Sequence, residues 1–213
     1  MRFEDQRKLL IEELKRAGIS DSAVLESFLK VPRECFVLPE YKEYAYRNQP
    51  LPILQKQTIS QPLMIGIMMQ YLELKEDDLV LEIGTGSGYQ SALLANIVRE
   101  VCTIERIEEL SLKAQSVIKT QGYKNIFFKI GDGAVGWKKA YPPHTAFSKI
   151  IISAAAENIP PALVNQIAEG GIMVLPLGSG YYQVLNRLVK VNGQIRTTEH
   201  GGCAFVPLIT NDK

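Results

Sequence analysis

The chain has few of the residues that build metal centres and nucleophilic triads. Its 213 residues include only two histidines and three cysteines. His144 and His200 lie far apart, with no cysteine or carboxylate at ligand spacing, so we expect no metal site and no histidine-based triad. Cys35, Cys102 and Cys203 are odd in number and scattered, which excludes a disulfide framework and predicts three buried thiols.

Net charge and long apolar runs are also lacking. The chain has 24 Lys and Arg against 23 Asp and Glu, a formal net charge of +1, so no overall field draws it to nucleic acid or anionic lipid. No apolar run approaches the roughly 20 residues that span a bilayer, and the charged N-terminus does not resemble a signal peptide. We therefore expect a cytoplasmic monomer without nucleic-acid or membrane partners.

What the chain does contain is enough apolar sequence for one domain, since 46% of its residues are hydrophobic. We expect residues 1–213 to form a single unit. Residues 1–56 are predicted to be a small helical N-terminal cap and a loop-rich connection, in which Asp21 caps the second of two helices and Pro32 ends it. Residues 57–213 are predicted to form the binding and catalytic core.

Short β-branched runs alternate with helical stretches from residue 79 onward. The predicted strands are Leu79–Ile83, Val101–Glu105, Ile126–Ile130, Lys149–Ser153 and Gly171–Pro176. This alternation is typical of an α/β fold with a doubly wound, mainly parallel sheet covered on both faces. Near the end, Asn192-Gly193 joins the runs Val184–Val191 and Gln194–Thr198, which predicts a hairpin that gives the sheet an antiparallel C-terminal edge.

A glycine-rich turn follows the first predicted strand. Gly84, Gly86 and Gly88 precede a helix that begins near Tyr89, so the backbone can lie close against a ligand. The spacing G-x-G-x-G differs from the dinucleotide fingerprint G-x-G-x-x-G, which seats a pyrophosphate at a helix N-terminus. A cofactor without a diphosphate is favoured. S-adenosylmethionine fits, and Glu82 can attract its cationic part.

Two more carboxylates follow neighbouring predicted strands. Glu105 ends the second strand, where a carboxylate accepts hydrogen bonds from ribose hydroxyls. Asp132, in Gly131-Asp132-Gly133, follows the third strand and could reach the adenine amino group. Each feature alone also fits a solvated strand end or a turn. The combination with Glu82 at one glycine turn favours an S-adenosylmethionine site.

Ser60 lies just before a predicted helix that starts at Pro62. The segment Thr58 to Gln61 is predicted to be the turn that enters this helix. Ser60 has two interpretations at this point, a helix cap or a functional hydroxyl, because nothing nearby in the sequence activates it as a nucleophile.

Several segments together resemble the protein-L-isoaspartate O-methyltransferase family, and the resemblance covers nearly the whole chain. They are Gln57-Thr-Ile-Ser-Gln-Pro62, Val80-Leu-Glu-Ile-Gly-Thr-Gly-Ser-Gly-Tyr89, Glu105-Arg-Ile107, Gly131-Asp-Gly133, Glu169-Gly-Gly-Ile-Met-Val-Leu-Pro-Leu-Gly178 and Phe205-Val-Pro-Leu208. The glycine turn is shared by many methyltransferases, whereas the first and last segments are more particular to this family. The resemblance implies a Rossmann-like class I S-adenosylmethionine-dependent methyltransferase fold with a seven-stranded sheet.

The resemblance also implies an activity. The substrate would be the free α-carboxylate of an L-isoaspartyl residue, or less readily a D-aspartyl residue, in a damaged protein or peptide. The methyl ester then closes to a succinimide, and hydrolysis returns some normal aspartate. Such a carboxylate is already ionised at neutral pH, so the lack of a candidate general base, with only two widely separated histidines, is consistent with this chemistry.

Site residues follow from the resemblance and the motifs together. Ser60 is the expected active-site residue, and it would position the carboxylate rather than become methylated. The expected cofactor-binding residues are Glu82, Ile83, Gly84, Thr85, Gly86, Ser87, Gly88, Glu105, Arg106, Gly131, Asp132 and Gly133. The expected substrate-binding residues are Thr58, Ile59, Ser60, Phe205, Val206 and Pro207.

Three positions depart from the family pattern. Lys56 stands where a glycine often occurs, Ser148 replaces a frequent aspartate, and Ala204 replaces an arginine found in many bacterial members. The loss of the arginine removes one ionic contact to substrate, for which Lys56 is a candidate substitute. The alternatives are another S-adenosylmethionine-dependent methyltransferase acting on RNA or a small molecule, and a non-catalytic cofactor-binding module. A nicotinamide-dependent dehydrogenase is disfavoured by the glycine spacing.

Overall fold

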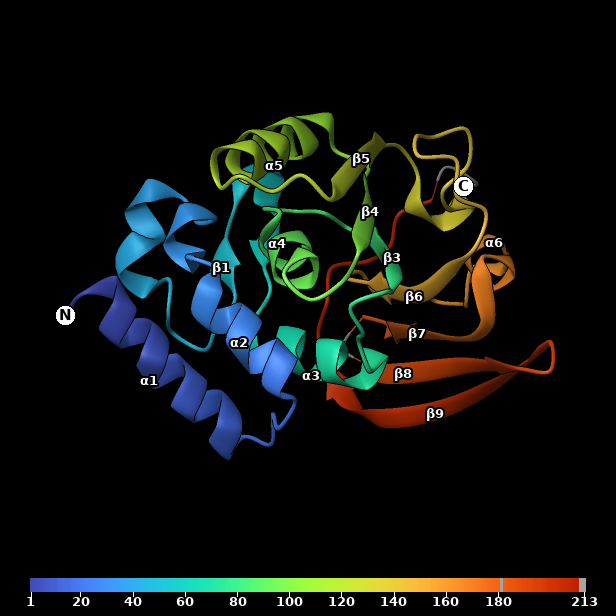
Figure 1. Cartoon of the computed structure of the whole chain (residues 1–213), viewed down its shortest axis with the longest axis horizontal. Coiled ribbons are helices and arrows are strands. Elements are labelled where there is room, and N and C mark those ends of the chain that lie inside the picture. The colour runs from blue at the N-terminus through green and yellow to red at the C-terminus, as the bar shows by residue number, and fades with distance from the viewer. Residues whose placement is uncertain (181, 211–213) are drawn as a thin grey trace.

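The N-terminal cap consists of two helices, as the sequence predicts. The computed structural model describes residues 1–180 and 182–210, and Figure 1 shows it with the N-terminal helices beside the central sheet. Helix α1 spans Phe3–Arg16 and α2 spans Ser22–Lys30. The Asp21 carboxylate accepts hydrogen bonds from two backbone N–H groups in the first turn of α2, at 2.9 and 3.1 Å, which confirms it as the cap.

The connection to the core is built from short turns and a two-stranded ladder. The 3-10 turns are η1 (Arg33–Cys35), η2 (Pro39–Tyr44) and η3 (Leu54–Lys56). Strand β1 (Leu51–Pro52) pairs with β2 (Thr58–Ile59), so the first two residues of the predicted turn before Pro62 are extended instead. This pairing fixes the segment that leads to Ser60. Helix α3 (Pro62–Leu72) begins where predicted.

The central sheet has seven strands, in the order β5-β4-β3-β6-β7-β8-β9. Their bounds are Leu79–Ile83 (β3), Glu100–Glu105 (β4), Ile126–Ile130 (β5), Phe147–Ile152 (β6), Ile167–Ser179 (β7), Tyr182–Val191 (β8) and Gln194–Cys203 (β9). Strands β3 to β7 are parallel, and β8 runs antiparallel to both of its neighbours. The predicted α/β architecture with an antiparallel C-terminal edge is confirmed.

The last three strands, β7 to β9, extend further than the sequence predicts. Asn192 and Gly193 have φ angles of 53° and 75°, as a type I′ turn requires. Strand β7 continues to Ser179 and β9 to Cys203, because cross-strand pairing with β8 keeps polar and glycine residues extended beyond the apolar runs. Apolar periodicity alone therefore underestimates the length of these strands.

Successive residues of β3 point to opposite faces of the sheet. Val80 belongs to the hydrophobic cluster that includes side chains of α1 to α4 and of α5 (Glu108–Thr120). Leu79 and Leu81 belong to a second cluster, which includes Trp137 and Leu163 of α6 (Pro161–Asn165). Helix α4 (Tyr89–Ala95) follows β3 and contributes to the first of these clusters. Both faces are thus covered, as expected for a sheet of this class.

Strand β3 lies at the switch point of the sheet. It pairs with β4 on one side and with β6 on the other, so the chain leaves the sheet in opposite directions from this position. In open α/β sheets a crevice forms there, at the carboxyl ends of the strands. The glycine-rich turn that follows Ile83 opens into this crevice.

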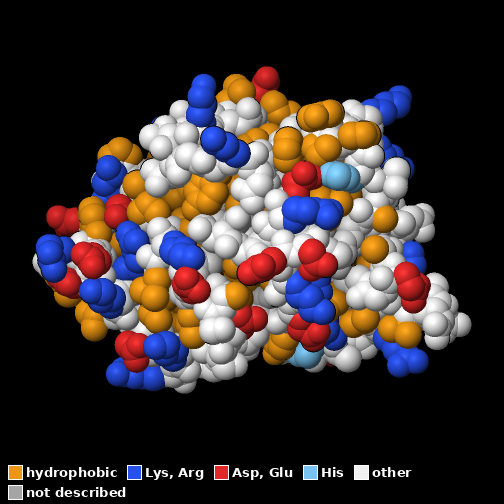
Figure 2. Space-filling model, in the orientation of Figure 1, with side chains coloured by type: hydrophobic (Ala, Val, Ile, Leu, Met, Phe, Trp, Pro, Cys, Tyr) orange, Lys and Arg blue, Asp and Glu red, His pale blue; other side chains and the backbone are white. Residues whose placement is uncertain are grey.

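The distribution of charge on the surface and the burial of the cysteines can be compared with the sequence predictions. Lys, Arg, Asp and Glu side chains are interspersed on the face shown in Figure 2, without a large patch of one sign. Of the three free cysteines, Cys102 is buried, Cys203 is half-buried and Cys35 is exposed, so the prediction of three buried thiols is wrong for two of them. Cys35 ends a 3-10 turn whose buried side chain is Arg33. None of the described helices is both long and apolar enough to cross a membrane.

Candidate active site

One pocket lies between the carboxyl ends of the central strands, the turn before α3 and the segment after β9. The predicted residues that line it are Thr58, Ile59, Ser60, Ile83, Gly84, Thr85, Gly86, Ser87, Glu105, Arg106, Gly133, Val206 and Pro207. These come from parts of the chain that are separated by up to about 150 residues. The predicted cofactor and substrate segments therefore line a single pocket.

The glycine-rich turn has the backbone geometry that the motif predicts. Gly86 and Gly88 have φ angles of +54° and +83°, where a side chain would be strained. A Cβ on Gly88 would lie 3.2 Å from the Cβ of Ala114, so this glycine also lets α5 pack closely. The backbone N–H of Gly86 donates to Oε2 of Glu105 over 2.9 Å. The turn is thereby tied to the end of the neighbouring strand.

Glu105 is held in a fixed orientation at the end of β4. Its Oε1 accepts a hydrogen bond from the backbone N–H of Ile107 at 2.9 Å, and the residue is only 6% exposed. A carboxylate has about four lone-pair sites, so two remain for a ligand after these two hydrogen bonds. Because Glu105 lines the pocket, this arrangement fits recognition of a diol such as ribose.

Glu82 is fully buried behind the pocket rather than on its wall. It accepts hydrogen bonds from Nε2 of Gln90, at 3.0 Å, and from the hydroxyl of Ser91. Burial raises the pKa of Glu82 to about 7, although the hydrogen bonds from Ser91, Thr103 and Gln90 oppose this rise. The same Gln90 amide donates to Oγ of Ser153 over 2.8 Å, and both of these residues line the pocket.

The sequence interpretation missed Gln90 and Ser153. The position of Gln90 in the first turn of the helix after the glycine motif is a signal that was available, because it faces the carboxylate of Glu82 eight residues earlier. Ser153 has no comparable signal, since only the parallel pairing of β3 with β6 brings it beside this turn.

Asp132 shapes the neighbouring loop. Its carboxylate accepts the N–H of Ala134 at 2.8 Å and caps the turn η4 (Gly133–Val135). A Cβ on Gly133 would lie 2.3 Å from Cγ2 of Ile83, so only glycine fits between this loop and β3. Asp132, Gly131, Gly88 and Glu82 are expected cofactor residues that the structure places near the pocket but not among its lining residues.

Ser60 is not the cap of α3. The N-cap residue is Gln61, and its side chain makes no capping hydrogen bond, so the helix-cap interpretation of Ser60 is wrong. The turn is instead held by Asn48, whose backbone carbonyl accepts from Nε2 of Gln61 at 3.0 Å and whose Oδ1 accepts the N–H of Leu63 at 2.9 Å. Ser60 is half-buried and lines the pocket.

Arg33 binds the same turn from the interior of the protein. Its Nη2 donates to the backbone carbonyl of Ser60 over 2.9 Å, and the residue is completely buried. Its guanidinium lies 4.7 Å from the centre of the Tyr89 ring, a cation–π contact. Burial lowers the pKa of Arg33 to about 10, so the group remains positively charged at neutral pH. The sequence gives no signal that this arginine is buried.

The segment after β9 forms the opposite wall. The carbonyl of Val206 accepts the N–H of Ala155 at 2.8 Å, and the N–H of Leu208 donates back to the Ala155 carbonyl at 2.7 Å. Gln183 holds Phe205 through hydrogen bonds to its N–H and its carbonyl, at 2.7 and 3.0 Å. Phe205 lines an adjacent groove rather than the pocket itself.

The three departures from the family pattern have different structural settings. The hydroxyl of Ser148 bonds both the N–H and the carbonyl of Leu79, at 3.0 and 3.1 Å, and so anchors the start of β3. Lys56 is exposed and has a left-handed φ of 56°. Ala204 is exposed.

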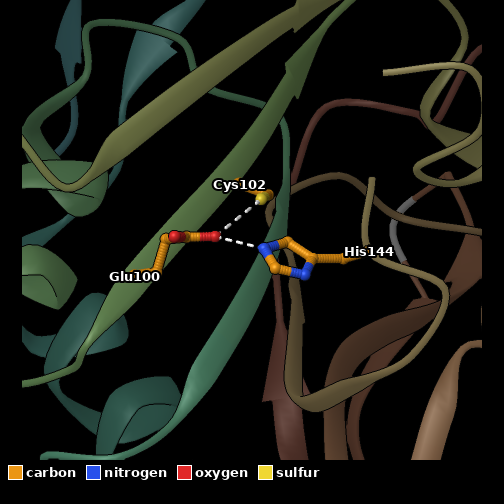
Figure 3. A group of neighbouring side chains, drawn as sticks. All are labelled: Glu100, Cys102 and His144. Carbon is orange, nitrogen blue, oxygen red and sulfur yellow. Dashed lines mark hydrogen bonds and ion pairs between the residues drawn. The ribbon is translucent and has the colours of Figure 1, made fainter. Parts of the chain in front are cut away.

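A second group of polar side chains lies at the other end of β4. Glu100, Cys102 and His144 bring their ligand atoms within 4.8 Å of one another (Figure 3). The sequence interpretation found no carboxylate or cysteine near His144, because these partners lie far away in the chain, Glu100 being 44 residues earlier. The structure therefore brings together a set of potential metal ligands that sequence spacing does not indicate.

Comparisons with known proteins agree with the geometry. The family model described as protein-L-isoaspartate(D-aspartate) O-methyltransferase matches residues 5–213. A protein-L-isoaspartate O-methyltransferase from Petrotoga mobilis is 51% identical over 211 residues, with 98% of each chain covered. One from Dictyoglomus turgidum is 48% identical, over 97% of this chain and 92% of the relative.

Solved structures show the same fold. A crystal structure assigned to the Plasmodium falciparum protein-L-isoaspartate O-methyltransferase, in complex with S-adenosyl-L-homocysteine, superposes with a TM-score of 0.84 and 28% identity. It covers 96% of this chain and 99% of its own. The family match and the high identity to its members lead to one conclusion: the chain belongs to the protein-L-isoaspartate(D-aspartate) O-methyltransferase family.

Proposed function

We propose that this protein is a repair methyltransferase. It transfers a methyl group from S-adenosylmethionine to the free α-carboxylate of L-isoaspartyl residues, and less readily of D-aspartyl residues, in damaged proteins and peptides. The observation that carries the proposal is the shared pocket, in which the Ser60 turn and the Val206-Pro207 segment face the glycine-rich turn and Glu105. Family membership supports the same reaction.

The cofactor half of the pocket would hold S-adenosylmethionine, which when bound supplies an electrophilic methyl group on a sulfonium. Glu105 would accept the ribose hydroxyls, and the backbone of Gly84 to Gly86 allows close approach of the ligand. Gln90 lies on the pocket wall and donates a hydrogen bond to the buried Glu82 carboxylate, so it would lie between this carboxylate and the cationic end of the cofactor. Asp132 would act at the adenine end, through the loop that it caps.

The substrate half needs no general base. A carboxylate with an ordinary pKa near 4 is already ionised at neutral pH, so the protein has only to align it and exclude water. The Ser60 hydroxyl would donate a hydrogen bond to this carboxylate and hold it in line for transfer. Thr58 and Ile59 on one wall, and Phe205 to Pro207 on the other, would hold the substrate backbone in an extended form.

The remaining expectations concern partners and location. We infer that the enzyme works as a monomer in the cytoplasm, with isoaspartyl proteins as its partners and without nucleic acid or membrane. Support for the absence of nucleic-acid and membrane partners comes from the near-zero net charge of +1. An enzyme that accepts damaged sites in many proteins gains little from steering by one sign of charge.

Transfer of a radiolabelled methyl group tests the proposal directly. The acceptor is a peptide that contains one L-isoaspartyl residue, and the control is the same peptide with normal aspartate. We expect base-labile label on the isoaspartyl peptide alone. Equal labelling of both peptides would contradict the repair function, and labelling of neither, with S-adenosylhomocysteine still bound in calorimetry, would favour a different acceptor. Binding of NAD instead would contradict the cofactor assignment.

A further inference from the structure

Glu100, Cys102 and His144 form a compact group at the amino end of β4. Glu100 and Cys102 are two residues apart on this strand, so their side chains point to the same face of the sheet. His144 comes from the connection between β5 and β6 and points toward both of them (Figure 3). The Sγ of Cys102 lies 3.9 Å from Oε1 of Glu100, and Nε2 of His144 is in direct contact with the same oxygen.

We propose that these three side chains are a zinc-binding site. Zinc accepts thiolate, imidazole and carboxylate ligands at about 2.0–2.3 Å, which places tetrahedral ligand atoms roughly 3.3–3.8 Å apart. The separation of 3.9 Å between Sγ and Oε1 is close to this value, and all three ligand atoms lie within 4.8 Å of one another. Zinc would enter by replacing the direct contact between His144 and Glu100, and a water molecule would complete the tetrahedron.

Charge and access also favour this occupant. One thiolate and one carboxylate balance the two positive charges of the ion, and a sulfur ligand favours zinc over magnesium or calcium. Cys102 is completely buried, whereas the side chains of Glu100 and His144 remain 21% and 27% exposed. His144 also lines an open surface hollow beside Tyr141 and Pro143.

The site is separate from the proposed active site. Glu100 begins β4 and Glu105 ends it, so the two groups lie at opposite ends of this strand, roughly 16 Å apart at 3.3 Å per residue. Zinc would join the β5–β6 connection to the central sheet through His144. We therefore expect it to raise the thermal unfolding midpoint and to leave methyl transfer unchanged.

Cobalt(II) is the spectroscopic probe, added to the full-length protein after treatment with a chelator. We expect one equivalent to produce a sulfur-to-cobalt charge-transfer band and the visible bands of a tetrahedral site, and Zn²⁺ to displace it. Cys102→Ser should lose the charge-transfer band. The matched control Cys35→Ser removes the exposed cysteine and should retain it.

Two further variants test the proposal if Cys102→Ser fails to fold. His144→Gln and Glu100→Gln alter partly exposed side chains, and each should weaken Zn²⁺ binding by at least about tenfold and abolish the rise in the unfolding midpoint. The proposal is overturned where the wild-type protein shows no charge-transfer band. It is equally overturned if the band survives in Cys102→Ser or disappears in Cys35→Ser, or if His144→Gln and Glu100→Gln bind Zn²⁺ as tightly as the wild type.

Discussion

The buried guanidinium of Arg33 donates a hydrogen bond to the backbone carbonyl of Ser60, over 2.9 Å. It thereby fixes the turn whose hydroxyl is proposed to position the substrate carboxylate, although Arg33 is fully buried and does not line the pocket. A hydrogen bond from a charged donor contributes about 1.5–3 kcal/mol. Arg33 is thus a positioning residue for the proposed reaction.

Replacement of Arg33 by methionine tests this role. We expect Arg33→Met to raise KM for an isoaspartyl peptide about tenfold, which corresponds to roughly 1.4 kcal/mol. Affinity for S-adenosylhomocysteine, measured by calorimetry, should stay within about twofold. Arg187→Met is a matched control, because Nε of Arg187 donates to the carbonyl of Tyr71 at the same distance of 2.9 Å but away from the pocket. If Arg33→Met loses affinity for S-adenosylhomocysteine by the same factor as its KM for the peptide rises, the variant is damaged in general instead.

The sequence predicts the parts of this site that depend on local motifs. The strand Leu79–Ile83, the glycine turn and the strand-end position of Glu105 follow from apolar runs and glycine spacing, and the structure has them where predicted. Arg33 could not be found in this way, because an arginine in a short turn is ordinarily solvated. Its burial depends on packing between the N-terminal cap and Tyr89.

Contacts between distant segments account for the other omissions. Ser153 meets Gln90 only because β6 pairs with β3, and His144 meets Glu100 only because the β5–β6 connection folds back over the sheet. The exposure of Cys35 has a similar origin, since the 3-10 turn directs Arg33 inward in its place. Periodicity identifies elements, whereas these positions depend on how the elements pack.

Ser60→Ala removes the hydroxyl that is proposed to hold the carboxylate. Loss of a hydrogen bond to a charged group costs about 1.5–3 kcal/mol, so we expect kcat/KM for the isoaspartyl peptide to fall roughly 10- to 150-fold. The affinity for S-adenosylhomocysteine serves as the internal control and should not change, because the backbone of the turn remains. Full turnover in Ser60→Ala, measured with the labelled methyl assay, would contradict the proposed role.

Glu82 makes the stability of the fold dependent on pH. Its folded-state pKa of about 7 lies above the ordinary value of 4.5, chiefly because of burial. The folded chain therefore binds this proton more tightly than the unfolded chain does. Its contribution to stability is full below pH 4.5, declines between pH 4.5 and 7, and is lost above pH 7.

Glu82→Gln removes this titration and keeps a neutral side chain of similar shape. We expect the free energy of unfolding of the variant, relative to the wild type, to rise by about 2–4 kcal/mol between pH 4.5 and pH 8. Urea unfolding at several pH values measures the difference. A difference that does not change with pH would show that Glu82 has the same pKa in both states.

Cofactor binding should be linked to the same proton. S-adenosylhomocysteine lacks the sulfonium of S-adenosylmethionine, so its α-ammonium group is the cation that would lie near Gln90. This charge stabilises the ionised form of Glu82, so binding of S-adenosylhomocysteine releases a proton when Glu82 is protonated. We expect its affinity to rise from pH 6 to pH 7.5 and then level off. In Glu82→Gln this dependence should disappear. Calorimetry in two buffers of different ionisation enthalpy detects the proton release, and an equal pH profile in both proteins would contradict the linkage.

Lys56 tests whether a departure from the family pattern acts through charge or through backbone conformation. Its φ of 56° is left-handed, and the adjacent Gln55 has a φ of 57° while its side chain bonds Glu109. Glycine adopts this conformation without strain, whereas a residue with a Cβ does so at a cost. We expect Lys56→Gly to raise the free energy of unfolding by about 0.5–1 kcal/mol, and Lys56→Ala to change it little.

The kinetic comparison of these two variants separates the explanations. Lys56 is exposed and is not among the residues that line the pocket, although Gln57 is. We therefore expect KM for the isoaspartyl peptide to remain within about twofold in both Lys56→Gly and Lys56→Ala. A rise in KM shared by both variants, and steeper at low ionic strength, would instead support the lysine as a substitute for the missing arginine at position 204, because a screened ionic contact weakens with added salt.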